Sequence, residues 1–167
     1  AQASPRIDIS DERTELLDTG GGVAHALPLL GHEPFFVINS DSFWIDRGEP
    51  ALERLRAAWD DEKMDCLLLL CPLPQTVGYD GNGDFVRDAS GRLARKAKAE
   101  GEPLAYIGAY LASPRLLAGA PAGKFSMNLL WDRAIAAGRL FGVSHLGRWL
   151  HVGTPDAIAL AESALRS

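Results

Sequence analysis

The sequence is poor in cysteine: two occur among 167 residues, Cys66 and Cys71, both in one apolar stretch. Side chains alternate between the two faces of a strand. Two cysteines five residues apart on one strand therefore point to opposite faces and cannot bridge each other. This spacing argues against a local disulfide framework. It predicts two buried thiols, which suits a protein of the reducing cytoplasm.

Positive charge is also scarce, because 17 Lys and Arg stand against 22 Asp and Glu, a formal net charge of -5. The densest basic group, Arg92, Arg95, Lys96 and Lys98, is followed at once by Glu100, and we interpret it as a solvated edge. A nucleic-acid surface needs clustered basic residues, so we expect no nucleic-acid partner. No apolar run approaches the roughly 20 residues of a membrane-spanning helix, so we expect no membrane partner either.

The chain does have enough apolar residues, 47% of the total, for one domain with a real core, and we expect residues 1–167 to form it. Continuous apolar runs at 35–38, 66–70 and 104–111 are typical of buried strands. Helical periodicity or capping signals occur at residues 23–30, 49–61, 113–118, 127–137 and from 155 onward. The predicted class is therefore α/β, with a mainly parallel sheet covered by helices on both faces.

Weaker patterns predict shorter strands. Polar and apolar residues alternate at 6–10, which predicts a short strand early in the chain. Residues 84–86 and 92–94 predict a hairpin, which carries no chemistry by itself. Residues 140–145 and 148–152 predict two further short strands.

The stretch 16–41 carries the strongest functional pattern. It begins with a predicted loop of five residues, Asp18, Thr19, Gly20, Gly21 and Gly22. Missing side chains in such a loop let a ligand touch backbone amides, and the first turn of the helix that follows offers further amides to an anion. The alternative is that the three glycines form only a turn.

A carboxylate follows the first buried strand, in the sequence Asn39-Ser40-Asp41. Open α/β sheets place their ligands just outside the carboxyl ends of their strands. Together with the glycine loop, Asp41 therefore indicates a site for a phosphorylated ligand and a metal ion. The alternative is an aspartate that only caps the strand end.

Gly108 lies in the middle of the third apolar run. A glycine within a central strand weakens it, and usually marks a place where another group approaches the backbone closely. Tyr106 and Tyr110 are expected on the same face as Gly108. The two rings either cradle a sugar or fill the core, and the sequence leaves both interpretations open.

In order, these motifs resemble a known family. The elements are TGGG, a helix, a buried strand and N-S-D, then Tyr106-Ile107-Gly108-Ala109-Tyr110, and finally Trp149-Leu150-His151-Val152-Gly153-Thr154-Pro155. Between about Arg6 and Leu165 the chain is similar to the sugar-1-phosphate nucleotidyltransferases. It resembles most the branch of N-acetylmuramate 1-phosphate uridylyltransferases and mannose-1-phosphate guanylyltransferases.

The resemblance implies a Rossmann-like three-layer fold with a mainly parallel mixed sheet. It implies a transferase of nucleotide-sugar and cell-wall biosynthesis that joins a nucleoside triphosphate and a sugar 1-phosphate, releasing pyrophosphate. Asp41 would be the catalytic residue and the ligand of Mg²⁺, a hard ion that prefers oxygen donors. The residues implied in substrate binding are Asp18, Thr19, Gly20, Gly21, Gly22, Asn39, Tyr106, Gly108 and His151.

Two departures from the family pattern shape these expectations. The strand and glycine-rich loop that hold much of the nucleotide in the family have no counterpart in the 167 residues. We therefore expect an N-terminally incomplete fold, completed by a separate N-terminal segment of the same protein or produced by proteolysis. In addition, His151 stands where many relatives have a second metal-binding aspartate.

Two other functions remain open. One is a non-catalytic nucleotide-sugar-binding homologue or partner subunit, which the missing loop and His151 favour. The other is a glycosyltransferase that uses a nucleotide-sugar. Such enzymes usually carry an Asp-x-Asp metal motif after the equivalent strand, whereas this chain has Ser40-Asp41-Ser42.

Overall fold

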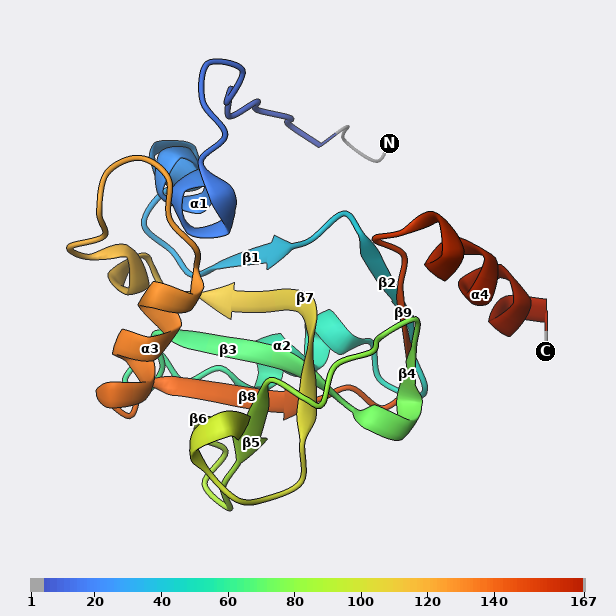
Figure 1. Cartoon of the computed structure of the whole chain (residues 1–167). Coiled ribbons are helices and arrows are strands. Elements are labelled where there is room, and N and C mark those ends of the chain that lie inside the picture. The colour runs from blue at the N-terminus through green and yellow to red at the C-terminus, as the bar shows by residue number, and fades with distance from the viewer. Residues whose placement is uncertain (1–4, 167) are drawn as a thin grey trace.

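The computed structural model describes residues 5–166 as an α/β fold built on two sheets (Figure 1). The larger sheet has six strands, in the order β6-β5-β7-β3-β8, with β1 also paired to β7. These strands are β1 (Phe35–Ile38), β3 (Cys66–Pro72), β5 (Phe85–Arg87), β6 (Leu93–Arg95), β7 (Leu104–Ala112) and β8 (Leu140–Ser144). The predicted α/β class with a mixed sheet is confirmed.

One strand direction differs from the prediction of a mainly parallel sheet. β3 and β8 pair in parallel, but β7 runs antiparallel to β3, β1 and β5. The connection between β3 and β7 contains short strands and 3₁₀ turns but no α-helix. A parallel neighbour needs a crossover, usually a helix, so the chain returns antiparallel here.

The core lies on both faces of β3, whose side chains alternate with period two. Cys66, Leu68 and Leu70 pack on one face, and Leu67 and Leu69 pack on the other. Helices α1 (Asp18–Leu30) and α3 (Asn128–Ala136) cover the first face, and α2 (Ala51–Ala58) covers the second. This arrangement confirms the helix layers expected on both faces of the sheet.

Both cysteines are buried and free, as the sequence predicts. Cys66 belongs to the core under α1 and α3, whereas Cys71 belongs to the core under α2. Burial raises the pKa of the Cys71 thiol to about 11, so the thiol stays protonated at neutral pH. Two protonated thiols on opposite faces have a packing role.

A smaller sheet lies at one end of the large one, in the order β2-β9-β4. It consists of β2 (Ser42–Ile45), β9 (Arg148–His151) and β4 (Thr76–Val77), and α4 (Pro155–Arg166) packs beside it (Figure 1). Within residues 5–166, no helix combines the length and the apolar character needed to cross a membrane.

The strand predicted at residues 6–10 is wrong, because this segment has no regular structure. Ile7 and Ile9 are exposed, with 81% and 84% of their surface accessible. An alternating pattern forms a strand only where a neighbouring strand accepts its hydrogen bonds, and within residues 5–166 this segment has none.

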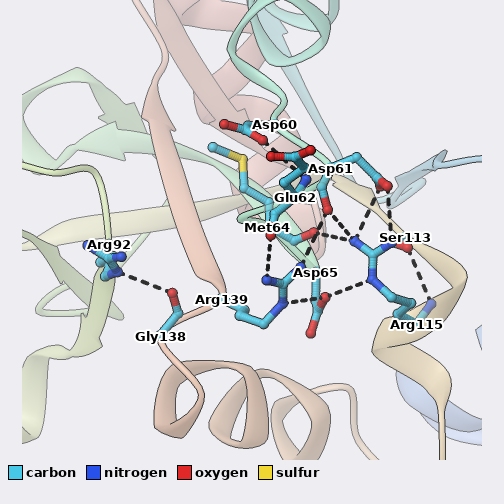
Figure 2. Close-up of polar contacts among 10 residues, drawn as sticks. All are labelled: Asp60, Asp61, Glu62, Met64, Asp65, Arg92, Ser113, Arg115, Gly138 and Arg139. Atoms are coloured by element: carbon cyan, nitrogen blue, oxygen red, sulfur yellow. Dashed lines mark hydrogen bonds and ion pairs between the residues drawn. The ribbon is translucent and has the colours of Figure 1, made fainter.

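An ion-pair network ties the start of β3 to the end of β7 and the start of β8 (Figure 2). Asp65 is its centre: its Oδ1 accepts from Arg139 Nε at 2.8 Å and from Arg115 Nε at 3.3 Å. The same arginines also donate to main-chain carbonyls of residues 61, 62 and 64. The network therefore joins the ends of three neighbouring strands.

We expect Asp65→Asn to lower the free energy of unfolding by about 1–3 kcal/mol, because two guanidinium groups lose a shared charged acceptor. Asp65 is largely covered, with 18% of its side chain exposed, whereas Asp61 is 55% exposed. Asp61→Asn is therefore the matched control, with a smaller expected loss in urea unfolding. Equal losses for the two variants would contradict the central role of Asp65.

Candidate active site

Two adjoining cavities lie beside β7: the larger is also lined by residues of α1, β1 and α3, and the smaller by residues of the small sheet. The larger has a volume of about 320 Å³ and the smaller about 240 Å³. Both are lined by Asn39, Asp84 and Tyr106, so the two hollows share a wall. Together they reach the size range of ligand pockets, about 300–1,000 Å³.

Asp41 and His151 line the smaller cavity. The pairing of β2 with β9 sets His151 opposite Ser42, and the main-chain N–H of Val152 donates to the Asp41 carbonyl at 2.9 Å. A methyl group built on Gly153 would lie 2.9 Å from His151 Nε2 and 3.7 Å from Asp41 Oδ2. The two predicted phosphate and metal contacts therefore face one small space beside Gly153.

The environments of the two side chains differ. Asp41 is exposed, whereas His151 is half-buried with its ring 5.7 Å from that of Trp149. Asp41 is thus available to a ligand or ion, and His151 is held in place by packing.

Gly108 brings β1 and β7 together at the cavity. Its carbonyl accepts a hydrogen bond of 2.7 Å from Asn39 N–H, which is the close approach to the backbone expected at a glycine within this strand. Gly108 also has a φ of 81°, a left-handed conformation that favours glycine. Tyr106 and Tyr110 lie on the same face, with ring centroids 6.3 Å apart.

Gly108→Ala is expected to cost about 1–2 kcal/mol of folding free energy, because an L side chain is strained at this φ. Gly31 has a φ of 83° with open space around its Cα, so Gly31→Ala imposes similar backbone strain away from both cavities. We expect both variants to unfold at a lower temperature than the wild type. Only Gly108→Ala is expected to weaken the binding of a phosphorylated ligand in the cavities. Equal binding by both would remove Gly108 from the site.

The predicted glycine loop is wrong in form, because residues 18–22 are the first turns of α1. The amides of Gly20 and Gly21 both donate to the carbonyl of Phe125, at 2.9 and 3.0 Å. A side chain on Gly20 would collide with the Phe125 ring, and one on Gly21 with the Gly123 carbonyl. The glycines therefore let the loop before α3 pack closely on α1, and their contact with substrate stays a prediction.

Asp18 and Thr19, by contrast, line the larger cavity. Asp18 has a φ of 63°, uncommon for a residue other than glycine although aspartate tolerates it better than most. Thr19 Oγ1 accepts from Met127 N–H at 3.0 Å, so it anchors the segment that leads into α3. Neither residue lines the smaller cavity with Asp41.

Two residues of the site were missed from sequence. Asp84 lines both cavities, and its Oδ2 accepts from Tyr106 N–H at 2.9 Å and from Tyr79 O–H at 3.3 Å. Arg95 lines the larger cavity, so the interpretation of its basic cluster as a solvated edge is wrong at this residue. The available signal was an aspartate at the start of a strand, but only tertiary structure shows that this hairpin borders the site.

The site is acidic and aromatic. Three aspartates, Asp18, Asp41 and Asp84, line the two cavities. The positive charge that faces them comes from Arg95 in the larger cavity. Burial, with a contribution from nearby negative charge including Asp41, raises the pKa of Tyr106 well above its usual range. The phenol therefore stays neutral and able to donate a hydrogen bond.

A divalent cation would offset this acidity. Within residues 5–166, no three His, Cys, Asp or Glu side chains cluster into a complete metal site. Mg²⁺ does not need one, because it is commonly held by one or two carboxylates, water and substrate phosphates. The exposed carboxylate of Asp41 beside an open space fits this manner of binding, whereas His151 is a poor ligand for such a hard ion.

Comparisons with known proteins place this geometry in context. No protein-family model matches the chain. The chain is 44% identical over 162 residues to the N-acetylmuramate alpha-1-phosphate uridylyltransferase of Caulobacter vibrioides, covering 97% of this chain and 67% of that protein. It is 30% identical over 151 residues to the enzyme of that name from Neisseria meningitidis serogroup B, covering 89% of this chain and 62% of that protein.

The fold is also similar to that of a UDP-glucose pyrophosphorylase crystallised with UDP-glucose. The TM-score is 0.69 with 16% sequence identity, over 92% of this chain and 64% of that one. The chain thus spans about two thirds of the length of the proteins it matches.

Proposed function

Because this chain belongs to the sugar-1-phosphate nucleotidyltransferase family, we propose that the protein forms a nucleotide-sugar and pyrophosphate from a nucleoside triphosphate and a sugar 1-phosphate. The favoured substrates are UTP and N-acetylmuramate 1-phosphate. The observation that carries this proposal is the 44% identity, over nearly the whole chain, to an enzyme named for that reaction. The product would supply cell-wall synthesis in the cytoplasm.

In the proposed reaction, an oxygen of the sugar 1-phosphate attacks the α-phosphorus of the triphosphate. The bond from that phosphorus to the bridging oxygen breaks, and pyrophosphate leaves with the electron pair. Such displacements need positioning and charge stabilisation more than covalent help from the protein. Asn39, Tyr106 and Gly108 would position the sugar, and His151 would donate a hydrogen bond to a phosphate oxygen.

Asp41 would hold Mg²⁺ together with substrate phosphates and water. When bound, the ion would supply charge neutralisation for phosphates that otherwise meet an acidic site. The three aspartates in the two cavities support this role, because without a cation they would repel the substrates.

A non-catalytic nucleotide-sugar-binding protein is the alternative, and the histidine at position 151 favours it. The two functions are separated by incubating the full-length protein with UTP, N-acetylmuramate 1-phosphate and Mg²⁺, and measuring pyrophosphate. We expect continuous release that needs all three components. Binding of a UDP-sugar without any pyrophosphate release would favour the alternative.

A further segment of the natural protein is proposed as a partner of β1. Among residues 5–166, β1 pairs only with β7, and Phe36 and Ile38 on it are 37% and 50% exposed. An unpaired strand edge with exposed apolar side chains is a template for another strand. We propose that such a strand completes the sheet and brings part of the nucleotide site.

We therefore expect the 167-residue chain to bind UTP weakly, with a Kd of about 1 mM or above, which is a binding free energy no more negative than about -4 kcal/mol. The physical reason is that the part of the nucleotide site brought by the proposed further strand is then missing. Calorimetry with Mg²⁺ measures this, and circular dichroism confirms that the chain is folded. A Kd below about 1 µM would contradict the proposal.

A further inference from the structure

Arg95, the last residue of β6, is held in a fixed orientation at the larger cavity. Its Nε donates to Asp132 Oδ1 at 2.8 Å and its Nη2 donates to the carbonyl of Asn128 at 3.2 Å. The guanidinium also lies over the Phe85 ring, 4.7 Å from the centroid. Its Nη1 has no hydrogen-bond partner within residues 5–166, so both N–H groups of Nη1, on a guanidinium held in place by its other contacts, are left for a ligand.

The rest of the larger cavity disfavours an anion. Asp18 and Asp84 line it, and its other walls are aromatic, apolar or neutral polar. A negatively charged substituent would be repelled by these two carboxylates anywhere except beside Arg95. Arginine matches a carboxylate better than lysine does, because its planar fork offers parallel N–H donors.

The two cavities also define a direction for the ligand. A phosphate beside Asp41 and His151 occupies the smaller cavity, and the shared wall of Asn39, Asp84 and Tyr106 then faces the sugar ring. A substituent on the side of the ring away from the phosphate enters the larger cavity, where Arg95 lies.

We propose that Arg95 recognises a carboxylate on the sugar, and that the substrate class is a sugar 1-phosphate with a second acidic group. This inference rests on the proposed function. N-acetylmuramate differs from N-acetylglucosamine by a lactyl ether that ends in a carboxylate. Arg95 is thus the specificity residue that separates these two sugar 1-phosphates.

The test compares kcat/KM for N-acetylmuramate 1-phosphate and N-acetylglucosamine 1-phosphate, with UTP and Mg²⁺, in the full-length protein. The variant is Arg95→Gln. The matched control is Arg92→Gln, from the same hairpin: Arg92 stacks on Phe141 and donates to the Gly138 carbonyl (Figure 2), outside both cavities. Arg95→Lys, which keeps the charge but loses the fork, serves if the glutamine variant fails to fold.

We expect Arg95→Gln to lower kcat/KM for the acidic sugar by about 10- to 100-fold, as for the loss of a hydrogen bond to a charged group, and to leave the neutral sugar within about twofold. Arg95→Lys keeps part of the preference, and Arg92→Gln keeps all of it. Equal losses for both sugars would make Arg95 structural and overturn the inference. A loss confined to the KM of UTP would assign the cavity to the nucleotide and also overturn it.

Calorimetric binding of the two sugar 1-phosphates to the same proteins, with Mg²⁺ and without UTP, separates this inference from the proposed function. If the wild-type protein transfers no nucleotide but binds the acidic sugar through Arg95, the proposed function fails and the inference stands. If it turns over the acidic sugar and Arg95→Gln binds both sugars as the wild type does, the inference fails alone. If neither turnover nor preferential binding of the acidic sugar occurs, both fail.

Discussion

Replacing Asp41 with alanine in the full-length protein is expected to lower kcat by about 1,000-fold, the upper end of what one lost electrostatic contact costs in an active site. Asp41 is exposed at the junction of β1 and β2, and its Oδ2 faces the same space as His151 Nε2. Without this carboxylate, the proposed Mg²⁺ loses its protein ligand and the phosphates lose an orienting centre. Raising the Mg²⁺ concentration is expected to recover part of the activity.

The fold is expected to be unaffected, because an exposed side chain outside the core rarely changes stability by more than about 0.5 kcal/mol. Asp156→Ala is the matched control, since Asp156 is also exposed but lines neither cavity. Retention of most of the turnover by Asp41→Ala would move the metal site elsewhere. Loss of turnover in the Asp156 variant as well would point to a general effect of charge.

His151 is expected to distinguish two substitutions. His151→Asp adds a second carboxylate beside Asp41, so the apparent affinity for Mg²⁺ is expected to rise by about tenfold, equivalent to about 1.4 kcal/mol. His151→Ala removes the proposed phosphate contact, so turnover is expected to fall without any gain in Mg²⁺ affinity. Activity measured over a range of Mg²⁺ concentrations gives both quantities.

Thermal unfolding gives a second measurement of the same site. Without Mg²⁺, His151→Asp is expected to unfold at a lower temperature than the wild type, because two carboxylates then repel each other across the space beside Gly153. Added Mg²⁺ is expected to restore more stability to this variant than to the wild type or His151→Ala. Identical Mg²⁺ responses from all three proteins would mean that His151 only packs against Trp149.

Period-two patterns allowed much of the core to be predicted. The alternation in β3 sets Cys66 and Cys71 on opposite faces, and the structure confirms this. The direction of β7 was not predictable in the same way. An apolar run is compatible with either pairing, and the absence of a helix between β3 and β7 determines the antiparallel one.

Site residues could be predicted only where they belong to a local motif. Asp41 follows a buried strand and so carries a signal in the sequence. Asp84 and Arg95 lie on a hairpin of ordinary composition and acquire a role because β5 packs against β7 beside the cavities. The glycines at 20–22 are the opposite case, in which a local motif predicts the wrong structure. They form a helical turn because amides of this segment donate to the Phe125 carbonyl and because the loop before α3 packs where side chains would otherwise lie.

We expect a nucleotidyl group to be transferred to the sugar 1-phosphate at the Asp41 site. Phosphorus NMR of the full-length protein with UTP, N-acetylmuramate 1-phosphate and Mg²⁺ tests it most directly. We expect the signals of UTP to be replaced by those of a diphosphate linked to the sugar and by free pyrophosphate in equal amounts, with Asp41→Ala giving neither. Release of orthophosphate with the sugar 1-phosphate unchanged, or the same product at the same rate from Asp41→Ala, would contradict the account.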